Sequence, residues 1–154
     1  MDNSRRIDDI PERLADNEVF VYWGNLAGKP TSMSAVIASL KFGARYGKRF
    51  GPNGKAWNVP VIDDTMEHKL PLAKIGRYVA MLIDEAKANP GRIYIVPEWL
   101  GGIGQWSTRD MAGLFAEARD MRNFRFTESF YDAIVTIKAN CTSCDGAMQN
   151  NGME

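Results

Sequence analysis

Two glycine-containing segments of this chain have the residue types and the spacing that best suit ligand chemistry. They are Gly24-Asn25-Leu26-Ala27-Gly28-Lys29 and Gly101-Gly102-Ile103-Gly104-Gln105. Glycine lets the main chain approach a ligand closely, and N–H groups beside a helix start suit a phosphate. We therefore expect both segments to border one cleft and to hold an anionic or nucleotide-like ligand. The Asn25 amide is expected to be free to donate and accept hydrogen bonds there.

The same glycines are compatible with a purely structural role in tight turns. Their spacing is neither the G-x-G-x-x-G dinucleotide fingerprint nor a P-loop, because no Gly-Lys-Ser or Gly-Lys-Thr is present. The glycines alone leave both interpretations open.

The strands that would position these segments are short apolar runs. Apolar, β-branched and aromatic residues predict buried strands over residues 18–23, 56–62, 92–96 and 131–139. Pro60 lies inside the second run and indicates an edge position or a bulge, since proline cannot donate to the ladder.

Three longer segments show helical spacing. Ser32 can cap a helix over residues 32–46, in which Val36, Leu40 and Ala44 share a face. Pro71 opens the clearest helix, with apolar residues at Ile75, Val79, Leu82, Ile83 and Ala86. Ser107 can cap a third, with Asp110 as an approximate capping box and with Met111, Leu114, Phe115 and Ala118 facing inward. A short helix is also expected at residues 11–14.

Strands alternating with helices imply parallel pairing with right-handed crossovers. We therefore expect an α/β fold, a three-layer sandwich with a mixed, largely parallel central sheet. Residues 1–140 are expected to form one domain, and residues 141–154, rich in Gly, Asn and small residues, a flexible tail.

The charge balance excludes several classes of partner. Nineteen Lys and Arg against nineteen Asp and Glu give no net field toward nucleic acid or an anionic membrane, so a bound anion must be held locally. No apolar stretch approaches the roughly 18 residues that span a bilayer. The first residues lack the apolar core of a signal peptide, so a cytoplasmic protein is expected, and a homo-oligomer is compatible with the sequence.

Two cysteines, Cys141 and Cys144, form a C-x2-C pair. A tetrahedral zinc site needs a second pair, and the chain offers only one histidine, His68. Inert thiols are favoured over redox chemistry or an intermolecular metal site. No metal and no cofactor are expected within the chain.

Five blocks of the sequence resemble a family of small phage and bacterial proteins related to the macro domain. The blocks are FVYWGNLAGK (20–29), FGARYG (42–47), AWNVPVIDD (56–64), LPLAKIGRYV (70–79) and GGIGQWSTRDMAGLF (101–115). The resemblance covers about residues 18–126 and implies a macro-like fold. It also implies binding of ADP-ribose or a related nucleotide between the two loops, and in a phage protein the sequestration of a host immune signal.

The chain departs from the family pattern at several positions. The glycine-rich helix start of the family is replaced by residues that include Ser32, Met33 and Ser34, so a ligand could meet hydroxyls and a thioether there. The region before the second loop contains Glu98 and Trp99. The loss of the family's polar groups puts inherited catalysis in doubt.

Several side chains could contact such a ligand. Trp99 and Trp106 flank the second loop and could stack on a base, although core packing is the alternative for each. Glu98, Asp63 and Asp64 could act as general bases or orient a ribose hydroxyl, or could be solvated loop carboxylates. His68 is given no role.

These patterns lead to two main hypotheses. The first is a protein that binds an ADP-ribose-like or cyclic nucleotide without converting it. The alternative is a hydrolase of ADP-ribose-type or phosphodiester bonds, in which Asn25 and an acid such as Asp63 or Glu98 position water. A protein that docks a partner through exposed tryptophans is a third. The absence of a Ser/His/Asp or Cys/His grouping favours binding.

Overall fold

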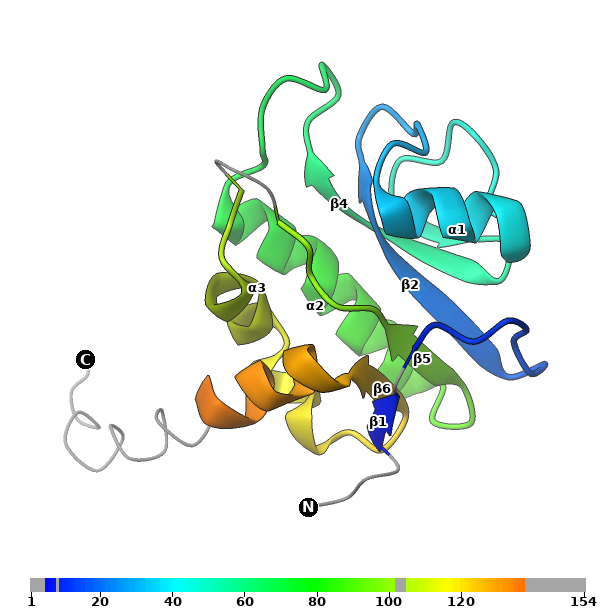
Figure 1. Ribbon diagram of the computed structural model, residues 1–154, viewed down its shortest axis with the longest axis vertical. Helices are drawn as coiled ribbons and strands as arrows, with labels where there is room; N and C mark the ends of the chain where they lie inside the picture. The colour runs from blue at the N-terminus through cyan, green and yellow to red at the C-terminus, as the bar shows by residue number, and fades with distance from the viewer. Residues whose placement is uncertain (1–4, 8, 102–104, 138–154) are drawn as a thin grey trace, which may run out of the picture.

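One mixed sheet of six strands, in the order β1-β6-β5-β2-β4-β3, organises the molecule (Figure 1). The computed structural model describes residues 5–7, 9–101 and 105–137. The strands are β1 (Arg6–Ile7), β2 (Glu18–Asn25), β3 (Gly51–Asn53), β4 (Ala56–Ile62), β5 (Ile93–Val96) and β6 (Phe124–Thr127). All neighbouring strands pair in parallel except β3 and β4. The described part of the chain is therefore an α/β fold, as the alternation of patterns predicted.

Helices cover both faces of this sheet (Figure 1). They are α1 (Met33–Lys41), α2 (Leu72–Ala88), α3 (Thr108–Leu114), a 3-10 helix (Ala116–Asp120) and a helix over residues 128–137. Successive side chains of β2 point to opposite faces. Phe20 and Tyr22 pack with α1, whereas Val21 and Trp23 pack with α2, α3 and the helix over 128–137. This arrangement is the expected three-layer sandwich.

Helix α2 matches its predicted pattern most closely. Its buried residues are Ile75, Val79, Leu82, Ile83 and Ala86, which are the five that the sequence pattern placed on the inner face. The predicted cap of α3 is also present, because the Ser107 hydroxyl accepts a hydrogen bond from the Asp110 N–H at 3.0 Å. Beside Pro60 the register between β2 and β4 shifts, which confirms the bulge.

Helix α1 is shorter than predicted and turns a different face inward. Gly43, at φ +77°, leads the chain out of the helix, so α1 ends at Lys41 rather than near residue 46. Val36 and Leu40, which the sequence pattern placed on one apolar face, lie on the outer side of the helix, because both are exposed. The small residues Ala35 and Ala38 are buried instead, and they let the helix approach the sheet closely.

Two other predicted elements are wrong. Residues 131–139 were expected to form a strand, but residues 128–137 are helical and the strand is β6. The buried Phe130, Tyr131 and Ile134 recur at helical spacing, which the β-branched residues of this segment obscured. Residues 11–14 contain no helix. The predicted tail at 141–154, with Cys141 and Cys144, lies outside the described residues.

Candidate functional site

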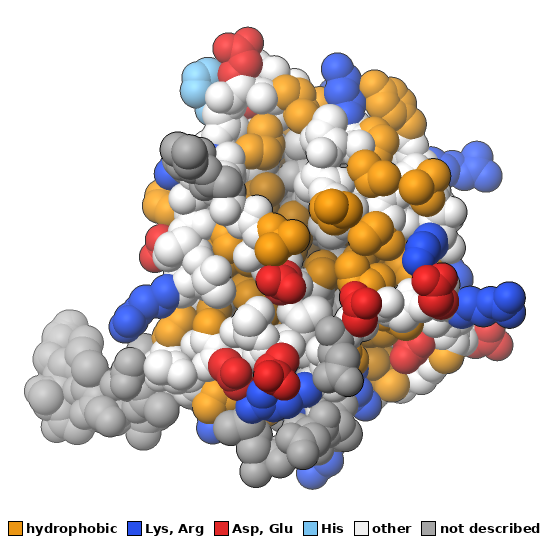
Figure 2. All heavy atoms as spheres, in the orientation of Figure 1, with side chains coloured by type: hydrophobic (Ala, Val, Ile, Leu, Met, Phe, Trp, Pro, Cys, Tyr) orange, Lys and Arg blue, Asp and Glu red, His pale blue; other side chains and the backbone are white. Residues whose placement is uncertain are grey.

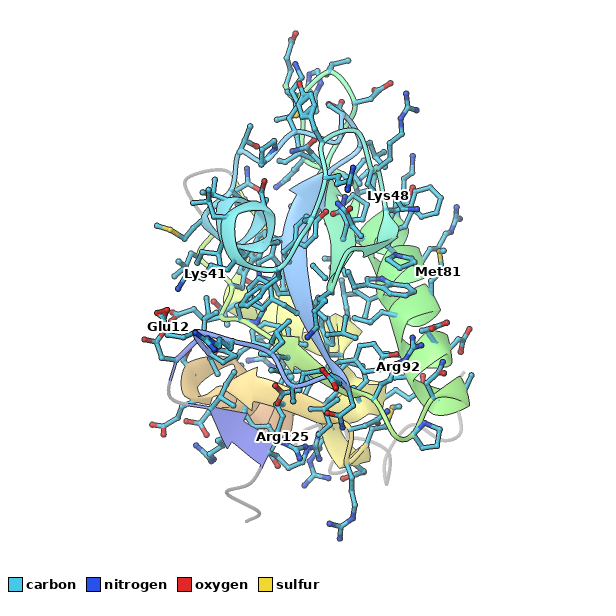
Figure 3. The ribbon with its side chains drawn as sticks, turned by 90° about the vertical axis from the view of Figure 1, so that its right-hand side faces the viewer. Glu12, Lys41, Lys48, Met81, Arg92 and Arg125 are labelled. Atoms are coloured by element: carbon cyan, nitrogen blue, oxygen red, sulfur yellow. The ribbon has the colours of Figure 1, made fainter. Side chains whose placement is uncertain are left out.

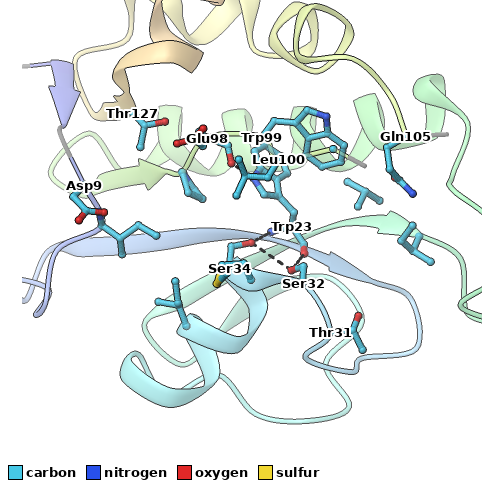
Figure 4. A pocket seen from close by; sticks show the side chains of 17 residues that line it. Asp9, Trp23, Thr31, Ser32, Ser34, Glu98, Trp99, Leu100, Gln105 and Thr127 are labelled. Atoms are coloured by element: carbon cyan, nitrogen blue, oxygen red, sulfur yellow. Dashed lines mark hydrogen bonds between the residues drawn. The ribbon is translucent and has the colours of Figure 1, made fainter. Parts of the chain in front are cut away.

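A cavity of about 560 Å³ lies between the start of α1 and the segment that follows β5 (Figure 4). Residues from the carboxyl ends of β2, β4, β5 and β6 line it, together with part of the N-terminal segment. The lining residues are Asp9, Ile10, Trp23, Thr31, Ser32, Met33, Ser34, Ile37, Val61, Ile62, Pro97, Glu98, Trp99, Leu100, Gly101, Gln105 and Thr127. In the space-filling view the surface beside α1 is hollowed and rich in hydrophobic side chains (Figure 2).

The connectivity of the sheet explains why the cavity lies there. Strands β2 and β5 are parallel neighbours, but β2 is followed by α1 on one face and β5 by α3 on the other. Connections that leave adjacent strands toward opposite faces open a crevice outside the carboxyl ends of those strands. The cavity thus occupies the position at which open α/β sheets bind ligands.

The start of α1 forms one wall. The Ser32 hydroxyl accepts a hydrogen bond from the Ala35 N–H at 3.1 Å and donates one to the carbonyl of Trp23. The Ser34 hydroxyl accepts from the Trp23 N–H at 2.9 Å. Both serines therefore fix the helix start against β2. Met33 and Ser34, the first two residues of the helix, line the cavity, and N–H groups in the first turn of a helix have no carbonyl partner within it.

Three tryptophans hold the opposite wall. The Trp23 ring donates to the carbonyl of Glu98 at 3.2 Å, and the rings of Trp23 and Trp99 meet nearly at right angles, with centroids 5.4 Å apart. Trp99 donates to the carbonyl of Trp106 at 2.6 Å, and Trp106 donates to the carbonyl of Leu70 at 2.8 Å. This chain of indole hydrogen bonds fixes the segment after β5. Trp23 and Trp99 line the cavity, whereas Trp106, a predicted stacking residue, does not.

The packing of this wall leaves no room for a side chain at Gly101. A Cβ atom on Gly101 would lie 2.6 Å from the Trp99 ring nitrogen and 2.9 Å from the Trp106 carbonyl oxygen. Any side chain here would therefore separate the donor from its acceptor. The glycine serves close packing beside the cavity.

The first glycine segment does not face the cavity, which corrects the prediction for it. Its residues Gly24, Asn25 and Gly28 line a separate recess of about 20 Å³. The side-chain oxygen of Asn25, Oδ1, accepts from the N–H groups of Ala27 and Lys29, at 3.1 and 3.0 Å. The Asn25 amide nitrogen donates to Lys29 O at 2.7 Å and to the Thr31 hydroxyl at 3.2 Å. The expectation of a free Asn25 amide is therefore wrong.

The glycines of this segment make room for a neighbouring loop. A Cβ on Gly24 would lie 2.0 Å from Oδ1 of Asn58, a buried side chain whose amide nitrogen donates to the carbonyls of Lys48 and Arg49. A Cβ on Gly28, at φ +72°, would lie 2.7 Å from the main chain of Gly47. The alternative interpretation, that these glycines have a purely structural role, thus explains both Gly24 and Gly28.

The predicted site residues therefore separate into three groups. Those that line the cavity are Ser32, Ser34, Glu98, Trp99, Gly101 and Gln105. Those that do not are Gly24, Asn25, Leu26, Ala27 and Gly28. Gly102, Ile103 and Gly104 lie outside the described residues.

Asp63 and Asp64 do not line the cavity. Asp63 closes its own loop: its Oδ1 accepts from the Thr65 hydroxyl at 2.7 Å and its Oδ2 lies 3.2 Å from Nδ1 of His68. The hydrogen bond from Thr65, followed by those from His68, lowers the pKa of Asp63. Among the three predicted acids, only Glu98 is in a position to meet a ligand in this cavity.

Several lining residues were not predicted, including Asp9, Thr31 and Thr127. Thr127 ends a strand that the sequence pattern missed, and Asp9 belongs to the N-terminal segment, in which no site residue was predicted. Thr127 could have been predicted as a lining residue if β6 had been placed next to β5, because the carboxyl ends of neighbouring parallel strands lie at one edge of the sheet.

The charged side chains that line the cavity are acidic. Asp9 and Glu98 line it, and no Lys, Arg or His is among its described lining residues.

Within the described ranges, no group of three His, Cys, Asp or Glu side chains is arranged to hold a metal ion. In the same ranges, no helix has the length and apolar character needed to cross a membrane. Comparisons of the chain with protein-family models, curated proteins and solved structures found no match.

Proposed function

We propose that this protein binds a nucleotide-derived small molecule, of the ADP-ribose or cyclic-nucleotide type, in the cavity beside α1. The observation that carries the proposal is a cavity of about 560 Å³ at the point where the connections after β2 and β5 diverge. Its size lies within the ~300–1,000 Å³ typical of small-molecule sites.

The walls of the cavity suit the parts of a nucleotide. Since no described Lys, Arg or His lines the cavity, a phosphate would be held by the N–H groups at the start of α1, with the partial positive charge of a helix N-terminus. The buried indole of Trp99 supplies an aromatic wall for a base or sugar face. The acceptor side chains of Asp9 and Glu98 suit hydroxyl or amino groups of the ligand.

The proposal is for binding without conversion. Ser32 and Ser34, the hydroxyls nearest the helix start, are engaged with the main chain of Trp23. Neither is paired with a general base among the described residues, as an activated nucleophile would be. Sequestration of a signalling nucleotide, as in a phage protein that counters host immunity, is the biological role we propose for such binding.

A thermal-shift screen tests this function. The protein would be melted with ADP-ribose, AMP, NAD and cyclic mono- and dinucleotides, and the bound compound recovered after heat denaturation. We expect at least one to raise the Tm and to be recovered intact. A compound recovered in altered form would make the protein a hydrolase, and no shift with any compound would refute nucleotide binding.

A pair of variants on α1 locates the site. Met33 lines the cavity and is 68% exposed, so Met33→Trp places a large side chain at the cavity with little effect on the core. Leu40 is 80% exposed on the same helix but does not line the cavity, so Leu40→Trp is the matched control. We expect the thermal shift to be lost in Met33→Trp and kept in Leu40→Trp. Equal shifts in both would place the ligand elsewhere.

A further inference from the structure

One end of the cavity brings together a buried hydroxyl and two carboxylates. The residues are Thr127 at the end of β6, Glu98 after β5 and Asp9 of the N-terminal segment (Figure 4). We call this group the acidic end. The start of α1 lies on another side of the same cavity, so a ligand could contact both.

The Thr127 hydroxyl has no hydrogen-bond partner among the described residues. The residue is only 7% exposed, and Oγ1 is itself shielded from solvent. In Figure 4 this oxygen lies on the side of Thr127 that faces Glu98. A buried hydroxyl without a partner is destabilising. Thr127 itself lines the cavity, so a rotation about its Cα–Cβ bond would turn the shielded Oγ1 toward a ligand group that could complete it.

The two carboxylates are also available. The Glu98 carboxylate is exposed and makes no ion pair or hydrogen bond with any described residue, and one oxygen of Asp9 accepts only from the Ile10 N–H at 2.7 Å. Beside Asp9, Ile10 packs against the core on the α1 side of the sheet, and the exposed Glu12 pairs with Lys41 of α1 at 3.0 Å (Figure 3). Both carboxylates can therefore accept further hydrogen bonds.

The chemistry of the three side chains selects the ligand group. Ionised carboxylates only accept hydrogen bonds, whereas the Thr127 hydroxyl can also donate one. A ligand hydroxyl can donate to a carboxylate and at the same time accept from Thr127. An ammonium group can donate to all three side chains but cannot accept from Thr127, so only a hydroxyl uses Thr127 as a donor.

We propose that the acidic end binds the vicinal hydroxyls of a ribose, with the phosphate of the same ligand at the start of α1. This inference rests on the proposed function and narrows it to ribonucleotides with a free 2′,3′-diol. Glu98 and Asp9 accept from the diol, and Thr127 donates to it. Cyclic nucleotides in which either hydroxyl is esterified are then poor ligands.

Calorimetric titration with AMP and 2′,3′-dideoxy-AMP tests the proposal, since the two compounds differ only in the diol. We expect the dideoxy compound to bind about tenfold or more weakly, the loss typical of one hydrogen bond to a charged group. Equal affinity for the two would overturn the diol proposal and leave nucleotide binding intact. If neither these nor any nucleotide of the screen binds, both proposals fail. Tighter binding of 3′-amino-3′-deoxy-AMP than of AMP would also overturn it, in favour of a cation.

Two substitutions assign the preference to this end of the cavity. Thr127→Val keeps the shape of the side chain and removes only the unpaired hydroxyl, so the variant should fold at least as stably as the parent. We expect Thr127→Val and Glu98→Gln each to reduce the preference for AMP over dideoxy-AMP to about threefold or less. Thr136→Val, at an exposed position of the helix over 128–137, is the matched control and should keep the full preference. An unchanged preference in Thr127→Val would overturn the role of this hydroxyl.

Discussion

Gly24 offers a direct test of whether the first glycine segment is shaped by packing or by a ligand. A Cβ atom at this position would lie 2.0 Å from Oδ1 and 2.7 Å from Cγ of Asn58. Asn58 cannot swing away cheaply, because it is 1% exposed and its amide nitrogen holds the carbonyls of Lys48 and Arg49. Overpacking of a well-packed site costs about 1–3 kcal/mol, so we expect Gly24→Ala to lower the free energy of unfolding by about 3 kcal/mol.

A double-mutant cycle isolates the steric contact. Asn58→Ala alone removes two hydrogen bonds and should cost about 2 kcal/mol. In the double variant the clash is absent, so we expect a total loss of about 2 kcal/mol rather than the sum of about 5, which is a coupling of about 3 kcal/mol. Urea denaturation followed by far-UV circular dichroism measures all four proteins.

A matched glycine controls for the intrinsic effect of the substitution. Gly113 lies in α3, and a Cβ there would meet nothing within 4 Å. Gly113→Ala should therefore stabilise the protein by about 0.5–1 kcal/mol through helix propensity. If Gly24→Ala leaves stability unchanged, or if the cycle is additive within about 0.5 kcal/mol, the packing explanation for this glycine is refuted.

Three further predictions concern the rest of the fold. The buried Arg5 donates hydrogen bonds to main-chain carbonyls, including that of Phe124 at 2.7 Å. We therefore expect Arg5→Met to lower the free energy of unfolding, measured by urea denaturation, by about 3 kcal/mol. A loss below about 1 kcal/mol would contradict the stabilising role of these hydrogen bonds. Burial raises the pKa of Tyr22, so its contribution to stability is complete below about pH 10 and is lost as the pH rises further. Melting from about pH 8 to about pH 11 should therefore show a steeper fall for the parent than for Tyr22→Phe, and parallel curves would contradict this. Ser107→Ala removes the N-cap of α3 and should cost about 1 kcal/mol, measured by urea denaturation with the exposed Ser129→Ala as a control that costs far less.

The layers of the fold could be predicted because local pattern and tertiary environment agree there. In α2 one apolar stripe meets the sheet, so the period of the sequence identifies the buried side chains. In α1 the contact is made by the small residues Ala35 and Ala38, which carry little hydrophobic signal, and larger side chains such as Leu40 remain exposed. The inner face of α1 was predicted wrongly for that reason.

The site could be predicted only in part because glycines and amides have two uses that look alike in a sequence. Gly24 and Asn25 have the composition of a ligand loop. However, Asn58 fills the space beside Gly24, and the side-chain amide of Asn25 forms hydrogen bonds with main-chain groups of Ala27 and Lys29. Only long-range contacts distinguish the two cases. Thr127 was missed because its place at the cavity depends on a strand order that no local pattern reveals.

The divergence of the connections after β2 and β5 has a consequence for how this scaffold could change over time. The walls of the cavity come mainly from chain segments that join the strands, and only a few of its lining residues, such as Trp23, Val61 and Trp99, also belong to the buried core. Exchanges at wall positions such as Met33 or Leu100 can therefore alter which compound fits without disturbing the elements that keep the chain folded. Selection for new ligand preferences, in nature or in a mutant library, would be expected to accumulate changes at these positions first.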